Sequence, residues 1–255
     1  MKRFLLYSLL GAFTALVAFP AMADEVFSIK PSFISLSPEG QFEATALGIT
    51  GTKMDVDQTL GLGRSNSGTV EASLHLGNFR LTGSYMPLNF SGSKPLGQTV
   101  NFNGQAFTAG TSINSKLEMD IFDIGLTYYI LNFDDLPMRI QIGPELSVKA
   151  IRASVSLTGA ALGLSENKSA TAPIPTLGLR GKVALADFLG LTFRAGGMAY
   201  AGNSFVDGEV QVEFSPIPLV GLNAGYRYVD VKVDESSVFV DASFSGPFLG
   251  AFIRF

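Results

Sequence analysis

His75 is the only histidine of the chain and the first residue whose type could do acid–base chemistry near neutral pH. A catalytic imidazole needs a nucleophile or a carboxylate within hydrogen-bond reach, and the neighbouring ionisable residues in the sequence are Glu71 and Arg80. His75 also stands two residues before Gly77-Asn78, a pair typical of a tight turn. We therefore expect His75 to be a satisfied polar residue near Glu71 or Arg80, and the sequence predicts no catalytic residue.

A second set of candidates consists of charged residues that alternate with apolar ones along several segments. Its basic members are Lys30, Arg80, Arg139, Lys149, Arg180, Lys182, Arg194, Arg227 and Arg254. Its acidic members are Glu71, Asp123, Glu145, Glu209 and Glu213. Charges gathered on one face of a closed sheet have two uses: they can pair and fill a narrow interior, or they can form an anion-favouring pore or binding cavity. We favour the filled interior.

Other motifs point to no metal or cofactor. Lys116, Glu118 and Asp120 lead into a predicted strand, and Asp55 and Asp57 lie in the first long loop. Two carboxylates at such a spacing could bind calcium, but a calcium site needs about six to eight oxygen ligands and the remainder cannot be identified. Gly61-Leu62-Gly63 lacks the helix and the Lys-Ser/Thr pair of a phosphate loop. The chain has no cysteine, which excludes disulfides and thiolate ligands. We interpret these residues as parts of solvated loops.

The segment 138–150 indicates which element must position the charges. Apolar residues at every second position alternate there with Arg139, Gln141, Glu145 and Lys149. A period of two over this length matches the roughly 9 to 11 residues with which a tilted strand crosses a membrane, whereas a helix would space its apolar residues by three and four. Pro144 is the one awkward residue. The pattern predicts a transmembrane strand with one lipid face and one polar face.

The same pattern recurs at 27–33, 70–76, 79–85, 122–130, 177–185, 191–200, 209–214, 222–228 and 237–255. We thus predict an all-β, antiparallel transmembrane barrel of about ten strands; eight is the alternative if the segments around Tyr200 and Val212 do not form a full hairpin. Tight turns are expected at 77–78, 132–137, 187–190 and 215–219, long loops at 39–67, 91–115 and 156–171, and short loops at 203–208 and 234–237. In such barrels the tight turns and both termini lie on the periplasmic side.

The first residues read as an export signal. Lys2 and Arg3 precede an uncharged apolar run at 4–19, and Ala21-Met22-Ala23 has the small-x-small form of a cleavage site. The expected domains are a signal peptide at 1–23 and a barrel at 24–255. No other stretch is apolar for long enough to be a membrane helix, although the mean hydropathy is +0.31. The net charge of −4 argues against a nucleic-acid partner.

The end of the chain carries a resemblance to a known class. Within the last strand, Gly250, Ile253 and Phe255 match the C-terminal assembly signal of bacterial outer-membrane β-barrels, while Phe248 stands where a polar residue is usual. Over its whole mature length the chain resembles small barrels of the OmpA, OmpX and OmpW type in pattern, without a family-specific functional motif. The resemblance implies an outer-membrane location in a Gram-negative bacterium, with membrane lipid, lipopolysaccharide and the barrel-assembly machinery as partners.

Two classes of outer-membrane barrel enzyme, omptin-type proteases and lipid A deacylases, use a histidine whose site lies toward the outer surface. His75 is expected on the opposite side. We therefore predict a non-enzymatic structural or surface barrel with a charged, largely filled lumen. The alternative is a small porin-like channel or carrier for small anions or apolar molecules, with inward-facing Phe244, Phe248, Phe252, Met86 and Met198. Phe102 and Phe107 are expected either to contact a partner or to fold over the barrel mouth.

Overall fold

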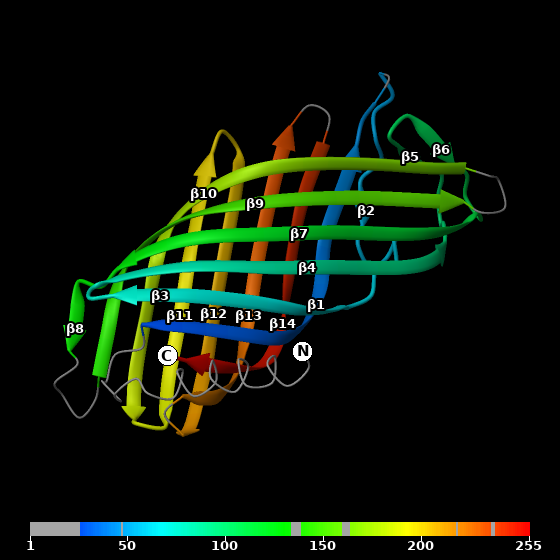
Figure 1. Ribbon diagram of the computed structural model, residues 1–255. Helices are drawn as coiled ribbons and strands as arrows, with labels where there is room; N and C mark the ends of the chain where they lie inside the picture. The colour runs from blue at the N-terminus through cyan, green and yellow to red at the C-terminus, as the bar shows by residue number, and fades with distance from the viewer. Residues whose placement is uncertain (1–25, 47, 134–138, 160–163, 218, 236–237) are drawn as a thin grey trace, which may run out of the picture.

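The computed structural model describes residues 26–46, 48–133, 139–159, 164–217, 219–235 and 238–255 (Figure 1). The predicted signal peptide lies outside them. The elements are β1 (Phe27–Ala44), β2 (Met54–Asp55), β3 (Ser65–Leu76), β4 (Phe79–Pro95), β5 (Val100–Phe102), β6 (Gln105–Phe107), β7 (Ser112–Tyr128), β8 (Leu131–Phe133), β9 (Arg139–Gly159), β10 (Leu164–Ala186), β11 (Leu189–Tyr200), β12 (Asn203–Ile217), β13 (Val220–Glu235) and β14 (Val238–Arg254). No helix of the described residues is long and apolar enough to cross a membrane.

Ten of these strands close into an antiparallel barrel. Around its wall the order is β1, β3, β4, β7, β9, β10, β11, β12, β13 and β14, and β14 pairs with β1 to close the ring. At the seam the amide of Phe255 donates to the carbonyl of Phe27 at 2.8 Å, and the Phe27 and Phe255 rings stack. Closure leaves no lipid-exposed sheet edge in the membrane. The predicted ten-stranded barrel is confirmed.

The eight-stranded alternative is wrong, because β11 and β12 form a full hairpin that pairs from Leu189↔Phe214 to Tyr200↔Asn203. The predicted loop at 203–208 is therefore the start of a strand, and the turn lies at 201–202. The three long loops are also shorter than predicted. Strands β1 and β4 run to Ala44 and Pro95, and β9 and β10 occupy nearly all of 156–171. The turn predicted at 132–137 includes the end of β8, and 134–138 lies outside the described residues.

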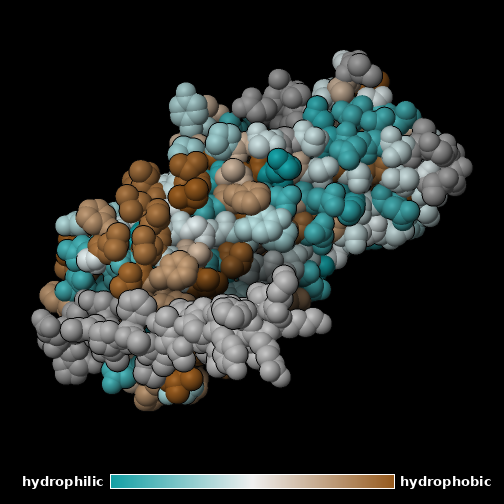
Figure 2. All heavy atoms as spheres, in the orientation of Figure 1, coloured by the Kyte–Doolittle hydropathy of each residue, from teal (hydrophilic) through white to brown (hydrophobic). Residues whose placement is uncertain are grey.

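An apolar belt surrounds one half of the barrel, which we call the membrane half. Figure 2 shows hydrophobic side chains gathered over this half and hydrophilic ones over the other. Exposed members of the belt include Ile29, Phe33, Val70, Leu81, Ile124, Leu126, Leu146, Val148, Leu177, Leu179, Val210, Val212, Leu222, Leu249 and Ile253. Outward-facing aromatic rings border it on both sides, and one such ring, Tyr85, donates its hydroxyl to Asp120 at 2.7 Å. This arrangement fits a bilayer with interfacial aromatic girdles.

Beyond the belt, the alternation of side chains reverses along the same strands. In β7 the outward residues Phe122 and Ile124 are apolar, but Glu118, further from the belt, is polar and exposed. The inward residues of β7 change in the opposite sense, from polar to apolar. Asp123 is charged, whereas Ile121 and the inward residues beyond it are apolar, except for Ser115. The strands thus continue into water as an ordinary barrel with an apolar core. We call this part the loop half, and the opposite end, which carries Val26 and Phe255, the termini end.

Gly246 lies at the closing seam, where β14 approaches β1. A Cβ atom there would stand 1.9 Å from the backbone carbonyl oxygen of Ser35. We expect Gly246→Ala to force the two strands apart and to lower the free energy of unfolding by about 1–3 kcal/mol, the usual cost of overpacking. Urea unfolding in detergent, followed by circular dichroism, measures it. Gly83→Ala is the matched control, because a Cβ at Gly83 meets nothing within 4 Å. Equal midpoints for both variants would contradict the close approach at the seam.

Candidate functional site

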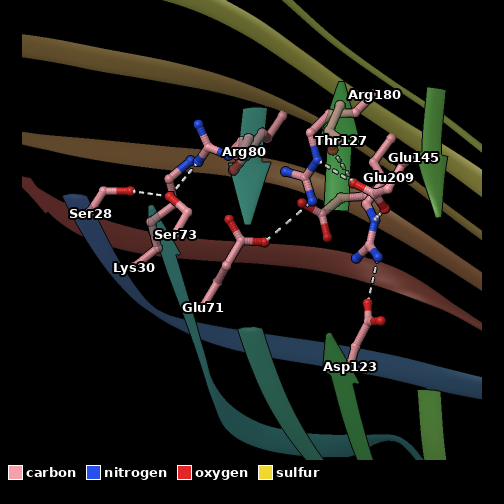
Figure 3. Close-up of polar contacts among 12 residues, drawn as sticks. Ser28, Lys30, Glu71, Ser73, Arg80, Asp123, Thr127, Glu145, Arg180 and Glu209 are labelled. Atoms are coloured by element: carbon pink, nitrogen blue, oxygen red, sulfur yellow. Dashed lines mark hydrogen bonds and ion pairs between the residues drawn. The ribbon is translucent and has the colours of Figure 1, made fainter. Parts of the chain in front are cut away.

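The lumen of the membrane half is filled by a network of ion pairs centred on Glu145 of β9. Arg180 of β10 donates its Nε to Glu145 Oε2 at 2.6 Å, and Thr127 donates its hydroxyl to the same oxygen at 2.9 Å. Arg194 of β11 pairs with the other oxygen, Oε1. Figure 3 shows Thr127, Glu145 and Arg180 converging from separate strands of the wall. All three charged members are nearly inaccessible to solvent, so each depends on the others for compensation.

The network continues across the barrel through Asp123 and Asp207. Arg194 Nη2 lies 2.5 Å from Asp123 Oδ2, and Lys149 Nζ lies 2.6 Å from the same atom. Lys149 also contacts Asp207 Oδ2 at 3.0 Å, where Arg227 Nη2 lies 2.9 Å away. A chain of alternating charges therefore joins β7, β9, β11, β12 and β13. Such a chain fixes the relative positions of the walls and leaves little space between them.

Nearer the termini end, Glu213 of β12 gathers three basic side chains. Lys30 pairs with its Oε1, Arg254 Nη2 lies 2.5 Å from its Oε2, and Lys182 Nζ lies 3.7 Å from Oε2. Beside this cluster, Arg80 donates to Ser73 at 2.7 Å, and the hydroxyls of Ser73 and Ser28 share a hydrogen bond of 2.7 Å. The basic excess seen in the sequence is thus concentrated at this end of the lumen.

The structure places most of the predicted lumen residues in this interior. Lys30, Arg80, Asp123, Glu145, Lys149, Arg180, Arg194, Glu213 and Arg227 are buried, and Glu71, Lys182, Glu209 and Arg254 are half-buried. Arg139 instead lies at the mouth of the termini end, where it pairs with the exposed Asp187 at 3.4 Å. Glu71 is 4.0 Å from Arg180, and Glu209 is 3.5 Å from Arg227. The set therefore includes one group of ion pairs around Glu145 and another around Glu213, and Arg139 lies at the rim.

Asp207 is the residue that sequence reasoning missed, because it was assigned to a loop at 203–208. It alternates in phase with Glu209, Gln211 and Glu213, and that period of two was the signal that could have found it. Its buried carboxylate is held by Lys149 and Arg227. Asn223 and Gln211, linked through a hydrogen bond of 3.0 Å, are further buried polar partners that the sequence did not single out.

His75 lies at the termini end, opposite Arg80 in the β3–β4 register. Its ring makes an edge contact with Tyr129, at 5.5 Å between centroids. His75 is therefore near Arg80, as predicted, and far from the loop half. Among the described residues no group of three or more His, Cys, Asp and Glu side chains could hold a metal ion. Asp55 instead accepts the backbone amides of Asp57 and Gln58, at 3.0 and 2.7 Å, which makes it a turn residue.

The loop half is closed by what we call the plug, residues 54–62 and 96–107. Its apolar side chains Met54, Val56, Leu60, Leu62, Leu96, Val100, Phe102 and Phe107 are buried and continuous with the core inside the barrel. Phe102 and Phe107 thus fold over the mouth, one of the two outcomes the sequence left open. Phe90 of β4 and Phe244 of β14 form the centre of that core, with ring centroids 5.2 Å apart.

Polar contacts tie the plug to the wall. The backbone amide of Val56 donates to the carbonyl of Gly40 at 2.9 Å, and that of Asn103 donates to Ala44 at 3.2 Å. Lys94 Nζ donates to the carbonyl of Asp57 at 3.1 Å. Just before the first part of the plug, the amide of Thr52 donates to the carbonyl of Asn101 in the second part at 2.9 Å. The plug is therefore held by β1, β4 and its own second segment.

The lumen contains small cavities. A cavity of about 150 Å³ opens at the termini end beside Arg80 and Lys182. Deeper inside, a cavity of about 30 Å³ lies between Lys30, Glu71 and Arg227. The charge network and the apolar core separate the first cavity from the loop half. The geometry favours a closed lumen over a continuous pore.

Comparison with known proteins identifies the fold. No protein-family model matches the chain, and no curated protein is similar in sequence. Among solved structures, the outer-membrane protease OmpT from Escherichia coli is 12% identical with a TM-score of 0.54, covering 93% of this chain and 99% of that one. Ail of Yersinia pestis is 13% identical (TM-score 0.41; 90% and 99% covered), and Neisserial surface protein A is 15% identical (0.40; 90% and 97%).

The structural similarity to OmpT shows the fold of this chain, and at 12% identity it does not show the activity. The chain has the fold of the small outer-membrane β-barrels of bacteria, as predicted. The apolar belt is the surface that such a barrel presents to the bilayer, which agrees with the predicted outer-membrane location. Barrels of this fold include an enzyme, so the fold by itself does not distinguish an enzymatic from a non-enzymatic chain.

Proposed function

We propose that this outer-membrane β-barrel is a non-enzymatic structural or surface protein whose lumen stays closed. The observation that carries the proposal is the double filling of the interior. Ion pairs occupy the membrane half, and an apolar core that includes Phe90, Leu60 and Phe102 occupies the loop half. A channel for small anions or apolar molecules would require the plug to leave and the network to part. Both steps would expose apolar surface or unpaired buried charge.

The non-enzymatic part of the proposal is supported by the position of the sole histidine. His75 faces the termini end, packed on Tyr129, and the buried carboxylates Asp123, Glu145 and Glu213 are each engaged by two or three basic side chains. A carboxylate held by cations in this way is a poor general base. The loop half would then act by its outer surface, while the belt contacts membrane lipid and lipopolysaccharide. Gly250, Ile253 and Phe255 would serve recognition by the barrel-assembly machinery.

A permeability assay tests the closed lumen. The protein, purified in detergent and reconstituted into liposomes, is expected to give no faster swelling in a small sugar than protein-free liposomes do. Its folded state is checked by the heat-dependent shift of its mobility on a gel. A general porin reconstituted at the same protein-to-lipid ratio is the positive control. Swelling that increases with the amount of folded protein would contradict the proposal.

A further inference from the structure

β10 has a free edge in the loop half. The strand starts at Leu164, but its pairing with β11 starts only at Leu177, and β11 ends at Tyr200. On its other side β10 pairs with β9 from Leu164 onward. No strand of the described residues pairs with 164–176 on the side of β11 (Figure 1). Leu177 belongs to the apolar belt, so this edge lies in water, beyond the membrane half.

Two prolines decide which part of the edge can accept another strand. Along an antiparallel strand, alternate residues direct their N–H and C=O groups to the same side. Pro173 and Pro175 have no N–H and lie within the β9–β10 ladder, so they occupy positions that face the free edge. Beyond them, the positions that face the same way are Ser165, Asn167, Ser169 and Thr171. All four have exposed side chains and can offer both main-chain groups to a partner strand.

The sequence of this edge is complementary to a second copy of itself. In an antiparallel pair centred on Asn167, Ser165 stands opposite Ser169 of the second copy, and these positions meet through their edge-facing main-chain groups. Glu166 in turn stands opposite Lys168, and the symmetry of the pair gives this opposite-charge contact twice. A centre at Ser165 or at Ser169 would place both charges opposite uncharged residues. Self-pairing therefore has one favoured register.

The groups that this register uses are accessible. Glu166 and Lys168 are both partly exposed. Asn103 of the plug donates its Nδ2 to Glu166 Oε2 at 2.9 Å, which leaves Oε1 as an acceptor for the lysine. Ser154 of β9 donates its hydroxyl to the side chain of Asn167 at 3.2 Å, so that contact does not involve the main chain of Asn167. The pairing displaces neither contact.

Antiparallel pairing also sets the orientation of the two molecules. β10 of the second copy runs in the opposite direction, so the membrane half of the second copy points away from that of the first. Two barrels inserted in the same direction in one membrane cannot meet in this way. Barrels in two membranes that face each other can.

We propose that the edge of β10 at 165–169 pairs with the same edge of a second copy in a facing membrane, and that the protein thereby joins outer-membrane surfaces to one another. The inference names a partner for the surface role proposed above, and it rests on that role for the position of the loop half outside the cell. One such contact is small and weak by itself. Many copies on each surface act together and make the attachment stable.

Clustering of liposomes that carry the purified protein tests the pairing, with turbidity as the readout. Wild-type liposomes are expected to cluster at low ionic strength. Glu166→Lys and Lys168→Glu each place like charges opposite one another, and each should slow clustering about tenfold. Liposomes of one variant mixed with liposomes of the other regain both opposite-charge contacts. The mixture should therefore cluster as the wild type does.

Lys116→Glu and Glu118→Lys are the matched controls. They make the same charge changes at the same level of the sheet, since Ser156 is opposite both Lys116 and Asn167, but β7 is paired on both sides. Each control should cluster like the wild type. Absence of clustering of wild-type liposomes, equal effects of edge and control variants, or no recovery in the mixture would overturn the proposal. Swelling of the same liposomes reports separately on the closed lumen, so failure of one proposal is distinguishable from failure of the other.

Ser169→Pro tests the main-chain hydrogen bonds at the edge. The amide of Ser169 faces the same way as positions 173 and 175, so its loss should leave the β9–β10 ladder intact. We expect at least about tenfold slower clustering, because the partner strand loses a donor on each side of the centre. The urea unfolding midpoint in detergent should stay that of the wild type. A lowered midpoint with unchanged clustering would show that this amide pairs within the barrel, which overturns the proposal.

Discussion

Replacing Glu145 by Gln is expected to lower the free energy of unfolding by about 3–5 kcal/mol, the usual cost of removing one partner from a buried ion pair. The substitution keeps the size of the side chain but leaves Arg180 and Arg194 without their shared negative charge. Both guanidinium groups are buried, so water cannot replace the carboxylate. The shift of the urea unfolding midpoint in detergent measures the effect.

Glu118→Gln is the matched control for this prediction. Glu118 pairs with Lys116 at 2.6 Å, but both side chains are about half exposed. Exposed pairs of this kind contribute about 0–1 kcal/mol, so the control midpoint should remain close to that of the wild-type protein. If the two variants unfolded at the same urea concentration, the lumen charges would be hydrated rather than buried, and the filled interior would be wrong.

The second large effect is expected at the core of the loop half. Phe90→Ala and Phe244→Ala should each cost about 3–5 kcal/mol, because each leaves a cavity in a closely packed apolar core. The two rings touch, so the effects should not add: we expect a coupling of about 0.5–1.5 kcal/mol in the double variant. Urea unfolding of the two single variants and the double variant completes the cycle.

This cycle also reports on the plug. Loss of the core should loosen residues 54–62 and 96–107, which pack on it, and should make them sensitive to added protease while the membrane half stays intact. Additive effects of the two substitutions, together with unchanged protease resistance, would contradict a continuous core that holds the plug in place.

The membrane half of the fold could be predicted from sequence because its outward face is uniformly apolar. Residues such as Leu146 and Val148 alternate with charged residues. This period of two is what a strand needs when it has lipid on one side and a polar lumen on the other. The pairing of neighbouring strands could be predicted from the tight turns between them. One such turn is at Gly77, where the backbone φ of +57° suits glycine. Ten strands and the inward position of most charged residues came from these two signals.

The loop half could not be predicted in the same way, because there the solvent on the outside is water. The apolar residues of β4 move from the outward Leu81 to the inward Leu88 and Phe90, so a search for apolar outward faces ends the strand too early. The ends of long strands were therefore mistaken for parts of long loops, and Asp207 was assigned to the short loop predicted at 203–208. Packing of the plug depends on contacts between distant segments, which no local pattern contains.

The central claim, a lumen closed by the network and the plug, is tested most directly by single-channel recording of the purified protein in a planar bilayer under a salt gradient. The account predicts no steady openings from protein whose insertion and folded state have been verified. Stable, anion-selective openings of the wild-type protein would contradict it. They would show that the ion pairs around Glu145 and the plug leave a path for ions, and that the basic side chains of the lumen select them.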